Sequence, residues 1–68
     1  MSASIRINGT EEKLAAANIA ELLAARGVAD GRGLAVALNG AVVPKRLWPE
    51  TRLSAGDDVE IVRPFGGG

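Results

Sequence analysis

Larger hydrophobic residues occupy alternate positions in three parts of the chain, with polar residues between them in two parts and alanines between them in the third, which is typical of strands with one buried face. These parts are residues 4–8, 34–38 and 58–63. The asparagine–glycine pairs at 8–9 and 39–40 favour tight hairpin turns, because both residue types tolerate a positive φ. The pattern therefore predicts two hairpins, whose returning strands occupy 11–14 and 41–43, and one further strand near the C-terminus.

A helical spacing follows the first hairpin. Its larger hydrophobic positions are Ile19, Leu22 and Leu23. Asn18 is a suitable N-cap, and Glu21 stands at the third helical position, where it completes a capping box. Gly27 is expected to end the helix after Arg26. The sequence thus predicts an amphipathic helix of about two turns, which is too short to be stable without a sheet to pack on.

The remaining segments complete the order of elements. Residues 30–33 and 54–57 are predicted turns or loops, and residues 45–51 are predicted to form an irregular crossover. The side chains expected to fix this crossover to the core are Leu47, Trp48 and Leu53. Hairpin, helix, second hairpin, crossover and last strand together predict an α+β fold of the β-grasp type, in which four or five strands form a mixed sheet on one helix. The first and last strands would pair in parallel at its centre, and residues 34–38 are also expected to form a central strand.

Alternation also predicts which side chains face the helix and which face away. The inward set is Ile5, Ile7, Leu34, Val36, Leu38, Val59 and Ile61, and the outward set is Arg6, Ala35, Ala37, Glu60 and Val62. We expect residues 1–65 to form the domain and residues 66–68 to form a flexible glycine tail. Trp48 is expected in the core, whereas Phe65, beside the tail, is a candidate docking residue.

Composition excludes several classes of function. The 68 residues include neither cysteine nor histidine, so thiol nucleophiles, imidazole acid–base catalysis and the common zinc ligands are absent. The formal net charge is +0 and the aromatic content is 3%, which disfavours binding to nucleic acid or to an anionic membrane. No apolar run is long enough to span a bilayer and no secretory signal is evident, so a cytoplasmic location is expected.

Paired acids and clustered bases offer only weak candidates for a site. The neighbouring carboxylates at 11–12 and 57–58 lie at predicted strand or turn positions, where adjacent side chains diverge, so we expect no metal site. The basic residues Lys45, Arg46, Arg52 and Arg63 are expected to form a solvated face rather than a patch for an acidic partner.

The glycines at 66–68 are the most unusual feature. One reading is a frayed end without function. The other is that a segment without Cβ atoms threads a narrow slot and delivers its α-carboxylate to the active site of another protein. A carboxylate resists nucleophiles until its oxygen becomes a leaving group, so an ATP-dependent partner would first have to adenylate it. A chain without cysteine or histidine could take part in covalent transfer in this way.

The whole chain resembles the ThiS family, the ubiquitin-like β-grasp sulfur carriers of thiamine biosynthesis. The resemblance rests on Asn39-Gly40, Val43-Pro44, Trp48, Leu53, Gly56-Asp57, Val59, Ile61 and Gly67-Gly68, in this order and spacing. It implies that Gly68 is adenylated and converted to a thiocarboxylate, whose sulfur passes to thiazole synthase. It implies no cofactor bound by this chain; ATP and magnesium would serve the adenylating enzyme, and a cysteine desulfurase or similar system would supply sulfur.

Two alternatives stay open beside this reading. Pro64-Phe65-Gly66 departs from the small apolar residues common in the family, and a proline before the double glycine is similar to the small subunit of molybdopterin synthase. A β-grasp interaction module with incidental glycines is the second alternative. Under the carrier reading, Gly66 and Gly67 give clearance for threading. The docking face for the adenylating enzyme would then comprise Phe65, Val62, Ala35 and Ala37.

Overall fold

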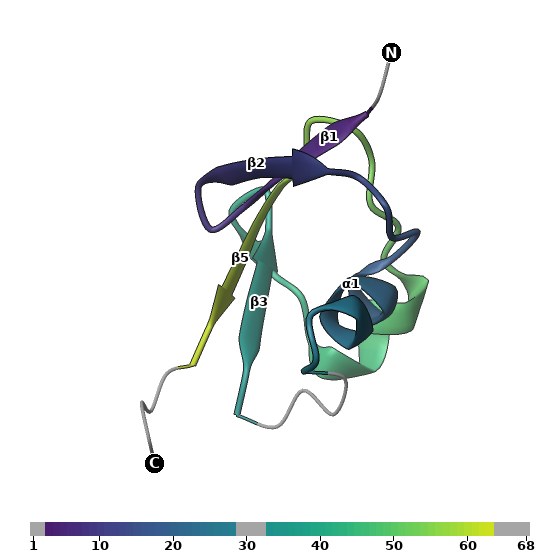
Figure 1. The fold of residues 1–68 in the computed structure, drawn as a ribbon. Coiled ribbons are helices and arrows are strands. Elements are labelled where there is room, and N and C mark those ends of the chain that lie inside the picture. The colour runs from purple at the N-terminus through teal and green to yellow at the C-terminus, as the bar shows by residue number, and fades with distance from the viewer. Residues whose placement is uncertain (1–2, 29–32, 64–68) are drawn as a thin grey trace.

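The computed structural model describes residues 3–28 and 33–63, and all statements about structure refer to these residues (Figure 1). They form a sheet, one α-helix and one 3₁₀-helix. The elements are β1 (Ser4–Ile7), β2 (Thr10–Lys13), α1 (Ile19–Ala25), β3 (Ala35–Leu38), β4 (Ala41–Val42), η1 (Lys45–Glu50) and β5 (Asp58–Val62). Most of the predicted loop at 30–33 lies outside the described residues.

The five strands form one mixed sheet in the order β2-β1-β5-β3-β4. β5 is parallel to β1 and antiparallel to β3, and both hairpin pairs are antiparallel. The predicted parallel pairing of the first and last strands at the centre is therefore confirmed. The middle position belongs to β5, and β3 lies between β5 and the short edge strand β4.

Both predicted hairpin turns are present with the same backbone geometry. Asn8 and Asn39 each have a φ of 52°, and the glycines that follow, Gly9 and Gly40, have φ values of 84° and 87°. Two successive positive φ values define the type I′ turn, whose twist matches that of the strands it joins. The turns fix the hairpin registers, so that Ile7 is opposite Thr10 and Leu38 is opposite Ala41.

The helix α1 begins as predicted and ends at Ala25, one residue earlier than predicted, with Arg26 as its C-cap. Asn18 Oδ1 accepts a hydrogen bond from the backbone N–H of Glu21 at 2.8 Å, and Glu21 Oε1 accepts one from the N–H of Ala17 at 3.0 Å. The carboxylate thus reaches the residue before the cap rather than the cap itself. After the helix, Gly27 has a φ of 81°, which is unstrained for glycine and turns the chain away.

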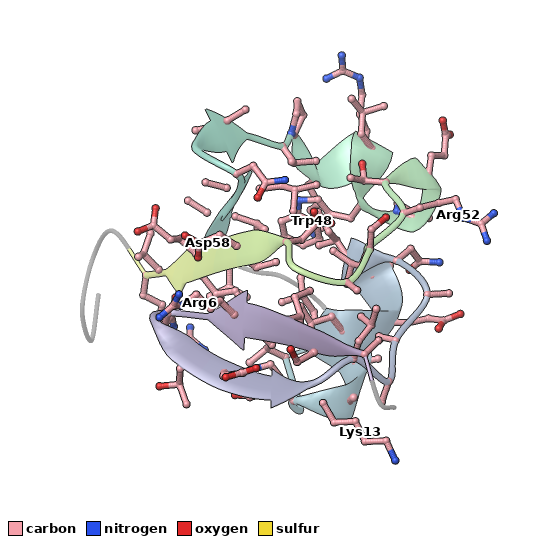
Figure 2. The ribbon with its side chains drawn as sticks, turned by 90° about the horizontal axis from the view of Figure 1, so that it is seen from above. Arg6, Lys13, Trp48, Arg52 and Asp58 are labelled. Carbon is pink, nitrogen blue, oxygen red and sulfur yellow. The ribbon has the colours of Figure 1, made fainter. Side chains whose placement is uncertain are left out.

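The core lies between the sheet and the two helices, which cover the same face (Figure 1). Its buried members are Ile5, Ile7, Ile19, Leu22, Leu23, Val36, Trp48, Leu53 and Val59. Three other predicted inward residues, Leu34, Leu38 and Ile61, are half-buried and pack against this cluster. Figure 2 shows Trp48 pointing into the interior, as expected.

The crossover at 45–51 is more regular than predicted. Residues Lys45–Glu50 form the 3₁₀-helix η1, which follows Pro44. The backbone N–H of Leu47 donates to the carbonyl of Pro44, three residues earlier, at 2.9 Å, which is the hydrogen-bond spacing of a 3₁₀-helix. The prediction that Leu47 fixes this segment to the core is wrong, because Leu47 is 36% exposed while Trp48 is 4% exposed. Trp48 and the buried Leu53 hold the crossover instead.

No helix within residues 3–28 and 33–63 combines the length and apolar character needed to cross a bilayer.

Candidate functional site

The candidate site begins where the middle strand β5 leaves the sheet. Val62, the last residue of β5, is paired with Ala35 at the start of β3. The structure therefore describes the strand that leads to the predicted reactive segment. The predicted site residues Phe65, Gly66, Gly67 and Gly68 lie outside the described residues, as does Pro64.

Two asparagine side chains hold the backbone of β5, one near each end. At the start of the strand, Asn39 Oδ1 accepts from the N–H of Asp58 at 2.9 Å. Near its end, Asn8 Oδ1 accepts from the N–H of Ile61 at 2.8 Å, and Asn8 Nδ2 donates to the carbonyl of Ile61 at 3.2 Å. The sequence pattern predicts only a turn role for both asparagines. The contacts depend on β5 lying between the two hairpins, which local sequence patterns do not reveal.

The outward face of the sheet carries a patch of small and branched apolar residues. The registers place Ala35 opposite Val62, and Ala37 between Val42 of β4 and Glu60 of β5. Val62 is 52% exposed and Val42 is 75% exposed. We call these four residues, Ala35, Ala37, Val42 and Val62, the outward patch. Both helices lie on the opposite face (Figure 1), so the outward patch is open to a partner.

Val42 is a member of the outward patch that sequence analysis missed. The signal was available, because a two-residue turn at 39–40 pairs Leu38 with Ala41 and therefore Ala37 with Val42. Cross-strand partners share a face, so an outward Ala37 implies an outward Val42.

A charged region borders the outward patch. Arg6 of β1 is paired in register with Asp58 of β5, and both residues, labelled in Figure 2, are exposed. Glu60, on the same strand as Asp58, is also exposed. A partner that covers this face therefore meets apolar surface on β3 and β4 and charges of both signs on β5 and β1. Such a surface is suited to recognition rather than to bond breaking.

The paired acids serve structural contacts. Glu11 Oε2 accepts from the hydroxyl of Ser4 at 2.8 Å, and Glu12 Oε1 lies 3.1 Å from Arg26 Nη1. Asp57 Oδ2 accepts from the N–H of Ser54 at 2.8 Å, which closes the turn before β5. Within the described part of the chain, no three acidic side chains gather in a way that could hold a metal ion.

The four basic residues come from two separate parts of the fold. Lys45 and Arg46 begin η1, Arg52 follows it, and Arg63 follows β5. All four are exposed, and Arg52 extends away from the molecule in Figure 2.

Comparison with known proteins identifies the family. The model of the ThiS family matches residues 5–68. The crystal structure of the thiamine biosynthesis protein ThiS from Geobacter metallireducens is similar, with a TM-score of 0.80 and 34% sequence identity over 96% of this chain and 99% of that one. No curated protein matches the chain. The chain belongs to the ThiS family and has its ubiquitin-like β-grasp fold.

Proposed function

We propose that this protein is the sulfur carrier of thiamine thiazole synthesis and that the carboxylate of Gly68 is its reactive group. The observation that carries the proposal is that the family match extends through residue 68 and so includes the terminal glycines. ThiS-family proteins are small sulfur carriers rather than catalysts, and they act with partner enzymes. The protein is thus a cosubstrate that is consumed and regenerated.

The proposed chemistry activates the carboxylate of Gly68 at its oxygen and then replaces that oxygen with sulfur at the carbonyl carbon. A carboxylate oxygen of Gly68 bonds to the α-phosphorus of ATP and pyrophosphate leaves, which gives an acyl-adenylate. A persulfide then bonds through its outer sulfur to the acyl carbon and AMP leaves with the oxygen, which gives an acyl disulfide. A thiol bonds to the other sulfur of this disulfide and breaks the S–S bond, which leaves a thiocarboxylate on Gly68 and a new disulfide between the thiol and the sulfur donor. ATP and magnesium act in the adenylating enzyme, and a cysteine desulfurase or similar system supplies the sulfur. Thiazole synthase then receives the sulfur, and the carboxylate is restored.

This chain contributes a docking surface and a narrow C-terminal segment. The outward patch, with Phe65, is the proposed docking surface for the adenylating enzyme, because small side chains allow a partner to approach closely. Gly66 and Gly67 have no Cβ atoms, so they provide the clearance for a narrow channel. The middle strand β5 connects the two, since Val62 belongs to the patch and precedes the glycines by only a few residues.

Intact-mass spectrometry of the protein isolated from its native host tests the proposal. We expect a fraction that is heavier by the difference between a sulfur and an oxygen atom, with the added mass in the C-terminal peptide. Deletion of Gly68, or addition of one residue after it, should abolish this fraction and leave the fold intact. If either variant still acquires sulfur, Gly68 is not the acceptor.

The pathway is tested separately by complementation. The gene is expected to restore growth to a host that lacks its thiamine sulfur carrier, and the Gly68 deletion serves as the matched control. Rescue of a molybdopterin synthase small-subunit mutant, without rescue of the thiamine mutant, would assign the same chemistry to the other pathway.

A further inference from the structure

We propose that Asn8 is a positioning residue for the C-terminal segment, because its side chain fixes the end of β5 that leads to the reactive carboxylate. The inference rests on the proposed function and adds to it a residue that lies far from the terminus in sequence. The juxtaposition that carries it is the pair of hydrogen bonds between the Asn8 carboxamide and the backbone of Ile61.

The need for this contact follows from the lengths of the strands. β1 ends at Ile7, which is paired with Val59 of β5, and the chain then turns away into β2. β5 continues beyond this pair to Val62. On the side of β1, the N–H and carbonyl of Ile61 would therefore have no strand to pair with.

Asn8 supplies the missing pairing with its side chain. A carboxamide carries one carbonyl acceptor and an N–H donor, as a peptide group does. Its Oδ1 lies 2.8 Å from the Ile61 nitrogen, and its Nδ2 lies 3.2 Å from the Ile61 oxygen. The ladder between β1 and β5 is thereby extended by one position. On the other side of β5, Ile61 is paired in register with Val36 of β3.

The left-handed backbone of the turn makes this reach possible. Asn8 has a φ of 52°, a conformation that asparagine adopts more readily than most residues. Glycine tolerates the same backbone but has no carboxamide. The replacement of Asn8 by Gly therefore removes the two hydrogen bonds and keeps the turn.

The consequence concerns how the reactive end is presented. With Ile61 bound by Asn8 on one side and Val62 paired with Ala35 of β3 on the other, β5 leaves the sheet from a fixed point close to Arg63. Without Asn8, Ile61 has no partner on the side of β1 and the end of β5 is held to the sheet by β3 alone, so we expect the terminal carboxylate to sample more positions while the partner is docked. Misplacement of a reacting group lowers the rate within the complex more than it lowers the affinity of the complex.

Asn39 offers a matched control for this test. It occupies the same position of the same type of turn, also has a φ of 52°, and also binds β5 through its side chain. Its side chain accepts from the N–H of Asp58 and donates to Asp57 Oδ1, both at the opposite end of the strand from the exit. N39G therefore removes comparable side-chain hydrogen bonds at the start of β5 and leaves the contacts at the end of β5, which leads to Gly68, in place.

The experiment compares full-length wild type, N8G and N39G. In amide hydrogen exchange of the isolated proteins, N8G should accelerate exchange at Ile61, and N39G at Asp58, each by at least about tenfold. Adenylation is then followed by ATP–pyrophosphate exchange with the adenylating enzyme of the same host, with the carrier as varied substrate. We expect N8G to lower the turnover at saturation at least about fivefold with KM unchanged within about twofold, and N39G to change neither by more than about twofold.

Each other outcome is decisive. Equal turnover for N8G and N39G, or a change of KM alone, overturns the positioning role while the proposed function stands. A wild-type chain that supports no pyrophosphate exchange overturns the proposed function and the positioning role together. If N8G does not fold, N8D replaces it, since it keeps the acceptor for the Ile61 N–H and loses the donor to the carbonyl. A fall in the turnover of N8D below that of N39G then supports the positioning role, and an unchanged turnover overturns it.

Discussion

The indole Nε1–H of Trp48 donates a hydrogen bond to the backbone carbonyl of Val43 at 2.9 Å, joining η1 to the end of β4. The Trp48 side chain is almost fully buried, so its ring fills the core while its polar atom stays paired. A single side chain thus closes the core beneath the crossover and holds the crossover to the edge of the sheet.

Substitution of Trp48 should separate these two contributions. W48F keeps an aromatic ring but leaves the Val43 carbonyl without its donor, so we expect a loss of about 1–2 kcal/mol in the free energy of unfolding. W48A also leaves a cavity, and the expected loss is about 3–5 kcal/mol. Urea unfolding followed by circular dichroism measures both values. Stability of W48F equal to that of the wild type would show that the hydrogen bond contributes nothing.

Loss of the N-cap should destabilise the short helix α1. N18A removes the oxygen that accepts from the Glu21 N–H, and such caps are worth about 1 kcal/mol. In a domain of this size we expect the melting temperature to fall by about 4–8 °C. N18D retains an acceptor and is the control, with a melting temperature close to that of the wild type. A similar fall for both variants would contradict the capping role.

The outward patch should bind the adenylating enzyme. A35R, V62D and V42D each place a charge in a surface that we expect a partner to desolvate, and each should weaken the complex at least about tenfold. Titration calorimetry with the adenylating enzyme measures the affinity, and thermal unfolding checks that the domain remains folded. V42D is the most informative of the three, because Val42 is the most exposed hydrophobic side chain of the outward patch.

A matched substitution on the other side of the molecule controls for charge alone. Arg46 is exposed on η1, and η1 lies on the face of the sheet opposite the outward patch. R46D should leave the affinity within about twofold of the wild type. Unchanged affinity in all three patch variants, or an equal loss in R46D, would refute docking at this face.

The ion pair between Glu12 and Arg26 should contribute little to stability. Their side chains are 37% and 38% exposed, so water screens the attraction across the 3.1 Å contact. In a double-mutant cycle of E12Q and R26Q, we expect a coupling of about 0.2–1 kcal/mol that declines as salt is added. Unfolding curves at low and high salt provide the measurement. A larger coupling that is insensitive to salt would show that this contact is shielded from solvent.

The local features of the fold were predictable because each depends on a few adjacent residues. Asn8-Gly9 and Asn39-Gly40 form the expected turns, and Asn18 caps the helix as expected. The 3₁₀-helix was not predicted. It is only six residues long and contains Pro49, which cannot donate a backbone hydrogen bond. The segment therefore lacks the 3.6-residue hydrophobic period by which an α-helix is recognised in a sequence.

The contacts of the candidate site depend on longer-range geometry. The pairing of Asn8 with Ile61 requires β5 to continue beyond the Ile7–Val59 pair at which β1 ends, and no local pattern encodes the relative ends of two strands so distant in sequence. The outward orientation of Val42 is intermediate in predictability between the local turns and the long-range contact of Asn8, because it follows from the turn once the orientation of Ala37 is known. The glycines 66–68 stand out in the sequence itself.

The parallel pairing of β1 with β5 also governs the order of events during biosynthesis. It joins residue 6 to residue 58, so a nascent chain can form its two hairpins early but lacks the strand that unites them. The sheet closes only after β5 has emerged from the ribosome. In a prematurely terminated product without β5, the two hairpins would therefore not be joined into one sheet. We expect such a product to be exposed to proteases and unable to compete with the mature protein for its partners.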